Sequence, residues 1–220
     1  MGANLMSLAR SGGKFLKLFG DRKMMKSLPY DAEVEYLEST GTQYVDTGVI
    51  IPPDVDFEFT GSIVSDIANG CVFGESYAFM WSPGNPGYAL VTTADGKIYL
   101  RYGNSTSTVI GLTDIGLANT FTASLEGNAF KVNGLLVSTV NRISSFDRPV
   151  SSMFVFRRNS ISANNPTFSA IRINNLKFGT LFDFIPVRKG TFGYMYDRVS
   201  GKLFGNAGTG AFVIGPDKTI

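Results

Sequence analysis

Glu33, Glu35 and Glu38 form the first group of residues whose type and spacing could do chemistry. Two carboxylates on one surface are the catalytic arrangement of most glycoside hydrolases. Glu33 and Glu35 share one face of an extended strand, but Glu38 joins them only if that strand runs unbroken to the turn that follows. We therefore expect solvated carboxylates at a sheet edge and no catalytic pair.

The chain lacks the residues on which most catalytic and metal sites depend. It contains no histidine and one cysteine, Cys71. Without histidine the usual general base near neutral pH and the usual metal ligand are missing. A single thiol cannot form an internal disulfide or a thiolate zinc site. We expect no enzyme activity, no cofactor, no metal site and a buried thiol.

A loop rich in proline and glycine is the best candidate for a binding surface. It reads FMWSPGNPGY, and it brings Tyr77, Trp81 and Tyr88 close together in the sequence. Aromatic rings can stack on sugar rings, although a lone tryptophan in a β-rich chain also commonly packs in the core. The polar runs NSTST (104–108) and NSISANNPT (159–167) could bind a glycan or be solvated loops. Tyr77, Trp81 and Tyr88 are thus glycan-binding candidates, with core packing as the alternative.

The rest of the chain is patterned as short strands that must position these residues. In DFEFTGSIVS, every second residue from Phe57 to Ile63 falls on one face, which is typical of a half-buried strand. The composition, with 25 glycines, 18 phenylalanines and 17% charged residues, favours strands joined by tight turns. Strands so closely spaced, without helical patterns between them, predict two antiparallel sheets packed face to face. Further strands are predicted at 71–74, 77–82, 88–93, 97–103, 119–126, 129–140, 152–157, 168–179 and 181–188.

Four short segments carry turn signals. Asn133-Gly134 is the strongest, because a type I′ turn needs positive φ at two successive residues and this pair accepts both. Gly127-Asn128 and Asp95-Gly96 mark similar reversals. The stretch YLESTGTQYVDTG (36–48) places small polar residues between two alternating segments, and we expect it to form a hairpin.

Two motifs at the ends of this body resemble a known family. YLESTGTQYVDTG and FGTLFDFIPVRKGTFGYMYDRVSGKLFGNAGTGAF (178–212) resemble the laminin-G-like, concanavalin-A-like jelly rolls of tailed phages, prophages and gut bacterial surface proteins. LEGNAFKVNGLLV (125–137) is similar to the mid-chain hairpin of such domains. The resemblance implies an all-β, two-sheet antiparallel jelly-roll sandwich over residues 30–220, in which the first and last strands pair in one sheet. These motifs are specific to the fold and not to a ligand.

The resemblance also raises the question of calcium, because laminin-G-like domains sometimes hold this ion near the rim of a sheet. The spacing of the acidic residues matches no calcium loop, so calcium rests on the resemblance alone. We expect Asp183 and Asp197 to bind turn amides or to pair with Arg188 and Arg198. The aspartates considered are Asp46, Asp54, Asp56, Asp66, Asp183 and Asp197.

Residues 1–29 differ from the rest of the chain in charge. They hold six basic side chains and one acidic one (+5), which leaves −3 for residues 30–220 out of a net +2. Their apolar stretches are too short for an export signal or for the roughly 20 residues of a membrane span. The segment could be a frayed terminus, a helix packed on its own domain, a membrane-surface helix or an anchor on a larger assembly, and we adopt the last. As a helical or extended anchor, it would use Phe15, Lys17, Leu18, Phe19, Met24 and Met25.

Together, the resemblance and the split charge predict a non-enzymatic structural or adhesion protein of a tailed-phage virion, as a head fibre, capsid decoration or tail component. Residues 1–29 would bind other virion proteins, and the sandwich would bind host glycans or neighbouring subunits. We expect a homo-oligomer, with a trimer favoured, because repeated copies increase avidity. The protein would be made in the host cytoplasm, and the charge of its body argues against nucleic acid. A membrane partner is not expected. The alternatives are a bacterial surface carbohydrate-binding module and, third, a polysaccharide-active enzyme.

Overall fold

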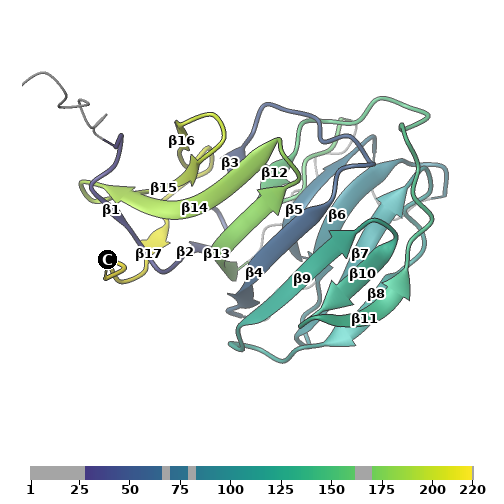
Figure 1. Ribbon diagram of the computed structural model, residues 1–220, viewed down its shortest axis with the longest axis horizontal. Coiled ribbons are helices and arrows are strands. Elements are labelled where there is room, and N and C mark those ends of the chain that lie inside the picture. The colour runs from purple at the N-terminus through teal and green to yellow at the C-terminus, as the bar shows by residue number, and fades with distance from the viewer. Residues whose placement is uncertain (1–27, 66–69, 79–82, 162–169, 220) are drawn as a thin grey trace, which may run out of the picture.

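The computed structural model describes residues 28–65, 70–78, 83–161 and 170–219, and these form an all-β sandwich (Figure 1). Two antiparallel sheets pack face to face, as the sequence predicted. None of the described residues forms a helix, and so none forms a helix able to cross a membrane. The anchor candidates between Phe15 and Met25 all lie outside the described residues.

The large sheet has eleven strands. Its main order is β11-β10-β9-β4-β13-β14-β15-β16, while β1 pairs with β14, and β2 pairs with both β13 and β17. The strands are β1 (Ala32–Glu33), β2 (Leu37–Thr40), β4 (Phe57–Ile63), β9 (Phe121–Glu126), β10 (Ala129–Val132), β11 (Leu135–Thr139), β13 (Ala170–Phe178), β14 (Phe182–Lys189), β15 (Phe192–Asp197), β16 (Lys202–Phe204) and β17 (Val213–Ile214).

The small sheet has six strands in the order β3-β12-β5-β6-β7-β8. The residues of β5, β6 and most of β7 are buried on both faces. At the far side of the sandwich the small sheet ends at β8 and the large sheet ends at β11, and these two edge strands are neighbours. The strands are β3 (Val45–Asp46), β12 (Phe154–Val155), β5 (Gly70–Ser76), β6 (Gly87–Thr92), β7 (Lys97–Gly103) and β8 (Ile110–Asp114).

Phenylalanine side chains fill the space between the sheets. Phe57 of β4 meets Phe73 of β5 edge to face with ring centroids 5.0 Å apart, and Phe73 meets Phe178 of β13 in the same way at 4.9 Å. All three rings are buried. Such pairs add roughly 0.5–1.5 kcal/mol each beyond the burial of their area. The phenylalanines of the two sheets therefore pack on each other in one core, as expected for two sheets packed face to face.

Three of the predicted turns occur as expected. Asn133 and Gly134 both have positive φ, at 49° and 76°, and they join β10 to β11. Gly127-Asn128 joins β9 to β10, and the Asp95-Gly96 turn joins β6 to β7. These reversals place β9, β10 and β11 in chain order along the large sheet.

The hairpin predicted at 36–48 is wrong. β2 belongs to the large sheet and β3 to the small sheet, so this stretch forms a corner that crosses from one sheet to the other. The buried side chain of Gln43 shapes the corner, because its Oε1 accepts hydrogen bonds from the Thr40 N–H at 2.8 Å and the Ser39 hydroxyl at 3.2 Å. The backbone at this corner is therefore bound by the side chain of Gln43, whereas in a hairpin it would be bound by a second strand.

The beginning and end of the described chain lie side by side, as the resemblance implied. β17 pairs with β2 through Val213 opposite Glu38. Beyond these strands, the Thr209 N–H donates to the Thr42 carbonyl at 3.2 Å, and the Ala207 N–H donates to the Tyr44 carbonyl at 2.8 Å. The C-terminal loop is therefore fixed along the corner.

Two strand predictions need correction. Tyr77 and Ala78 follow the end of β5 in a bend, and the rest of the strand expected at 77–82 lies outside the described residues. β8 was not predicted, because Gly111 has a φ of 64° and Leu112 is 54% exposed, so the segment lacks a regular buried face. β8 is nevertheless the strand that closes the small sheet beside β11.

Candidate functional site

Of the three glycan-binding candidates, the structure describes Tyr77 and Tyr88, and these two do not form one exposed surface. Tyr88 lies on β6 and is fully buried, so the expectation that its ring is available to a sugar is wrong. Tyr77 is partly buried, and the guanidinium of Arg148 lies 5.5 Å from the centre of its ring. Trp81 lies outside the described residues. The predicted aromatic surface is therefore not formed by Tyr77 and Tyr88.

Tyr88 instead belongs to a row of polar side chains on the inner face of the small sheet. Glu75 of β5 is paired across strands with Tyr88 of β6, and Tyr88 is paired with Tyr102 of β7. The two tyrosine rings meet edge to face with centroids 5.3 Å apart. All three side chains are at one end of the sandwich, beneath the loop that connects β3 to β4.

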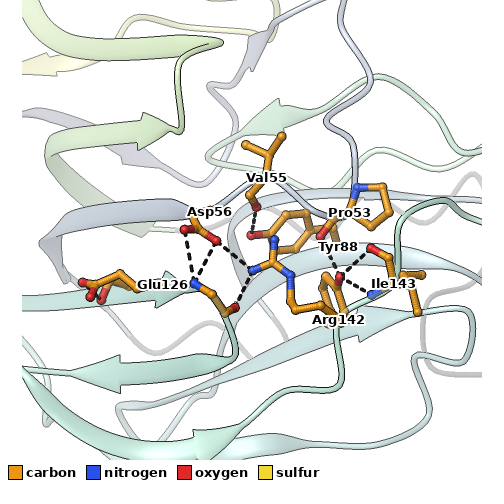
Figure 2. A network of polar contacts seen from close by, with 10 residues as sticks. Pro53, Val55, Asp56, Tyr88, Glu126, Arg142 and Ile143 are labelled. Atoms are coloured by element: carbon orange, nitrogen blue, oxygen red, sulfur yellow. Dashed lines mark hydrogen bonds and ion pairs between the residues drawn. The ribbon is translucent and has the colours of Figure 1, made fainter.

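This polar row binds alternate residues of the β3–β4 loop. The Ile51 N–H donates to Glu75 Oε2 at 2.9 Å. The Tyr102 hydroxyl donates to the Pro53 carbonyl at 2.6 Å, and the Tyr88 hydroxyl donates to the Val55 carbonyl at 2.9 Å (Figure 2). Residues 51, 53 and 55 are thus each bound by a different strand of the small sheet, namely β5, β7 and β6.

A second loop is fixed on the same row by Arg142. Its Nη1 donates to Asp56 Oδ1 and to the Gly127 carbonyl, both at 2.9 Å (Figure 2). Its guanidinium lies 5.5 Å from the centre of the Tyr102 ring, and the Ile143 N–H donates to the Tyr102 hydroxyl at 3.2 Å. The 140–143 segment is therefore held against both sheets.

The electrostatics of the row follow from its burial. Desolvation raises the pKa of Glu75 to about 9, and the hydrogen bond from Ile51 only partly opposes this shift. Burial also raises the pKa of Tyr88 well above its usual value. Both groups are therefore neutral at pH 7. Neither side chain is exposed to solvent, so Glu75 and Tyr88 support the β3–β4 loop from within the core.

A cleft opens beside this support, between the edge strands β8 and β11. It has a volume of about 350 Å³, and Tyr102 lies at its base. We call it the edge cleft. Its wall includes the end of the NSTST run, which the sequence suggested as a glycan contact. It is lined by Tyr102, Ser105, Thr108, Val109, Ile110, Ser138, Thr139, Val140 and Asn141.

The polar side chains of the edge cleft are available to a ligand. Among the described residues, the side chains of Thr108, Ser138, Thr139 and Asn141 make no hydrogen bond to one another or to any other group. Hydroxyl and amide groups both donate and accept hydrogen bonds. No acidic or basic side chain lines the cleft. This arrangement suits a neutral ligand that carries many hydroxyl groups.

Sequence reasoning found only one side of this cleft. Thr108 lies in the predicted NSTST run, whereas Ser138, Thr139 and Asn141 were assigned to a strand and its end. The signal that could have found them is the run STVN (138–141), in which polar residues end and follow a strand that carries no charge. The second polar run, NSISANNPT (159–167), does not line the edge cleft in its described part. Its Asn159 amide donates to the Ser152 carbonyl at 3.0 Å, and residues 162–167 lie outside the described part of the chain.

The structure places the glutamates at 33, 35 and 38 on two different strands and on the segment between them. Glu33 is on β1 and accepts from the Tyr30 hydroxyl at 3.4 Å, while Glu38 is on β2 in an ion pair with Arg172 at 2.6 Å. Glu35 lies between the two strands. Glu38 thus lies on a strand that is paired on both sides, and its side chain is 12% exposed, so the expectation of a solvated carboxylate at a sheet edge is wrong for this residue.

Most of the described aspartates serve as structural acceptors, and Asp66 lies outside the described residues. Asp197 accepts from the N–H groups of Asp183 and Ser200 at 2.8 and 3.0 Å, and Asp183 pairs with Arg198 at 2.8 Å, as predicted. Arg188 pairs with Asp217 instead of either predicted aspartate. Within the described ranges, no three potential ligands gather around a metal position.

Comparison with known proteins adds no relative: no family model matches this chain, and no curated protein matches it either.

Proposed function

We propose that this protein is a non-enzymatic structural and adhesion protein of a tailed-phage virion, and that its sandwich binds a neutral glycan in the edge cleft. The observation that carries the glycan part is the cleft lining, in which four residues with unengaged polar side chains border an uncharged hollow. A sugar presents hydroxyl groups in several directions and no charge. It can therefore use such a lining without leaving a buried charge unpaired.

The residue at the base of the cleft, Tyr102, is held in place by its neighbours, as the base of a preformed binding site should be. Tyr102 at its base is bound through its hydroxyl to Pro53 and Ile143, and Arg142 packs on its ring. A site whose base is fixed loses little conformational entropy when a ligand binds. The hydrogen bonds drawn in Figure 2 thus give the edge cleft a preformed shape.

The virion part of the proposal rests on the family resemblance and on the basic character of residues 1–29. In this proposal the segment attaches the sandwich to another virion protein, and a trimer presents several clefts to one host surface. Mass spectrometry of purified particles tests the location. Deletion of residues 1–29 tests the attachment: a folded sandwich that no longer loads onto particles is expected, and one that still loads contradicts it.

A glycan array followed by calorimetry tests the edge cleft. The cleft variant combines Thr108→Val, Thr139→Val and Asn141→Ala, and the matched control is Thr122→Val, an exposed threonine on β9. We expect a loss of affinity of about tenfold or more for the cleft variant, because three hydrogen-bonding groups are removed. Equal binding by the cleft variant, or no binding by the wild type, overturns the glycan site. Cleavage of the bound glycan would favour the polysaccharide-active alternative.

A further inference from the structure

A second hollow, on another part of the large sheet, has a different lining. It has a volume of about 290 Å³ and lies between β15 and the loop that follows β16. Figure 1 shows β15 and β16 away from the edge strands β8 and β11. We call it the hairpin hollow. Its walls include Phe192, Tyr194, Gly205, Asn206, Gly208 and Phe212.

The hairpin hollow exists because β16 is shorter than β15. β16 pairs only with Met195, Tyr196 and Asp197 of β15. The first half of β15, from Phe192 to Tyr194, has no partner on that side among the described strands. The chain after β16 instead diverges toward the corner at Thr42. The result is an open wedge beside two aromatic side chains.

The far wall of the wedge is fixed by hydrogen bonds. Asn206 Oδ1 accepts from the Tyr44 and Gly208 N–H groups at 3.1 and 2.8 Å, and its amide donates to the Gly210 carbonyl at 3.0 Å. The Thr42 hydroxyl donates to the Thr209 carbonyl at 3.0 Å. Asn206 has used one of its two amide hydrogens in these bonds. The wall is therefore preformed and retains a donor.

The near wall presents aromatic surface to solvent. Phe192 is 62% exposed, although an apolar ring of this size normally gains stability from burial. Tyr194 packs against Gly205, where an added Cβ atom would lie 3.2 Å from the edge of the tyrosine ring. Glycine at this position lets the ring lie directly on the backbone. The Tyr194 ring thus borders the hollow in a defined position, beside the exposed ring of Phe192.

We propose that the hairpin hollow is a second saccharide-binding site, in which a neutral sugar ring stacks on Phe192 and its hydroxyl groups meet Asn206 and the glycine backbone. The lining contains no acidic or basic side chain, which disfavours charged ligands. An apolar ring beside an amide donor and backbone groups matches the two-sided character of a sugar, which has an apolar face and a polar rim. This site lies apart from the edge cleft and extends the proposed function to two sites on one chain.

The test is binding of a neutral-glycan array by the full chain, followed by calorimetry with the glycans that bind. Phe192→Ala removes the stacking surface, Phe192→Tyr retains it, and Leu135→Ala is the control because Leu135 is 72% exposed elsewhere. We expect Phe192→Ala to lose about tenfold or more in affinity, with the other two variants unchanged. Phe192 is exposed, so its truncation should leave the melting temperature near that of the wild type.

The two sites are separated by combining variants. In the cleft variant, glycan binding that depends on Phe192 should persist, even if the edge cleft itself proves not to bind sugar. Equal binding by Phe192→Ala and the wild type overturns the hairpin site. So does binding at Phe192 of unmodified peptides from a tripeptide library in place of glycans. A wild type that binds no glycan overturns both sites.

Discussion

Glu75 and Ile51 are joined by a buried hydrogen bond in which the Ile51 N–H donates to one carboxyl oxygen of Glu75 at 2.9 Å. The other oxygen, Oε1, is buried and has no hydrogen-bond partner in the described structure. An ionised carboxylate would be poorly compensated there, which is why burial raises the pKa of Glu75 to about 9. At neutral pH the acceptor of this bond between the small sheet and the β3–β4 loop is therefore a protonated, uncharged acid.

Glu75→Gln should stabilise the protein at pH 8. The folded chain keeps the Glu75 proton up to about pH 9, whereas the unfolded chain loses it near the ordinary pKa of 4.5. The stability contributed by this group is fully present below pH 4.5 and is lost as the pH rises toward 9, at about 1.4 kcal/mol per pH unit. Urea unfolding from pH 5 to 8 should show the advantage of the glutamine variant growing with pH. Parallel curves for wild type and variant contradict this, and Glu58→Gln, on an exposed position, is the control.

Arg142→Ala should destabilise the fold by about 1–3 kcal/mol. The side chain of Arg142 is 13% exposed, and its loss removes a donor to the Gly127 carbonyl and leaves Asp56 with only the Gly127 N–H as a donor. Asp56 is 46% exposed, so Asp56→Asn should cost less than about 1 kcal/mol. Arg198→Ala is the matched control, because Arg198 also pairs with an aspartate but is 51% exposed. Thermal melting ranks the three, and an Arg198 variant as unstable as the Arg142 variant would contradict this role of Arg142.

Asp197→Asn should destabilise the protein at pH 7, and its difference from the wild type should shrink as the pH falls below 3.8. Burial alone would raise the pKa of Asp197, but hydrogen bonds from Ser200, Asp183 and Val199 together lower it. A lowered pKa means that the stabilisation is present above about pH 3.8 and is lost as the pH falls through the folded-state value. Asparagine replaces one acceptor oxygen with a donor, so we expect a cost of about 1–3 kcal/mol at pH 7. A difference from wild type that is independent of pH would contradict this origin.

Much of the fold could be predicted because short stretches of sequence determine its strands and turns. The alternation from Phe57 to Ile63 and the turn at Asn133-Gly134 specify strands and reversals without reference to distant residues. The corner at 36–48 could not be recognised in this way, because Gln43 binds the backbone there only once its side chain is buried. A period-two pattern shows that a strand is present, but it does not say to which sheet the strand belongs.

The candidate site was less predictable than the fold for a related reason. Tyr88 lies in YALVTT, a strand buried on both faces, so its alternation could not tell whether the ring faces the core or a ligand. Thr108 and Asn141 are 33 positions apart, and they meet only because β8 and β11 close their respective sheets on the same side. Convergence of two sheet edges is a property of the topology and has no local signature.

Gly208→Ala should be far more disruptive than Gly134→Ala, although both replace a loop glycine. At Gly134 an added Cβ atom meets nothing within 4 Å, so the cost comes from its φ of 76° alone and should be about 1 kcal/mol. At Gly208 the added atom would lie 2.0 Å from the Thr42 carbonyl oxygen, and this backbone contact cannot be relieved by a side-chain movement. We expect a cost of about 3 kcal/mol or more, with release of the loop that forms the far wall of the hairpin hollow. Hydrogen exchange of the backbone amides at positions 208 and 209 measures this release directly. Because the Thr209 N–H is bonded to Thr42 in the wild type, unchanged protection of that amide in the Gly208→Ala variant would show that the loop is not held as argued.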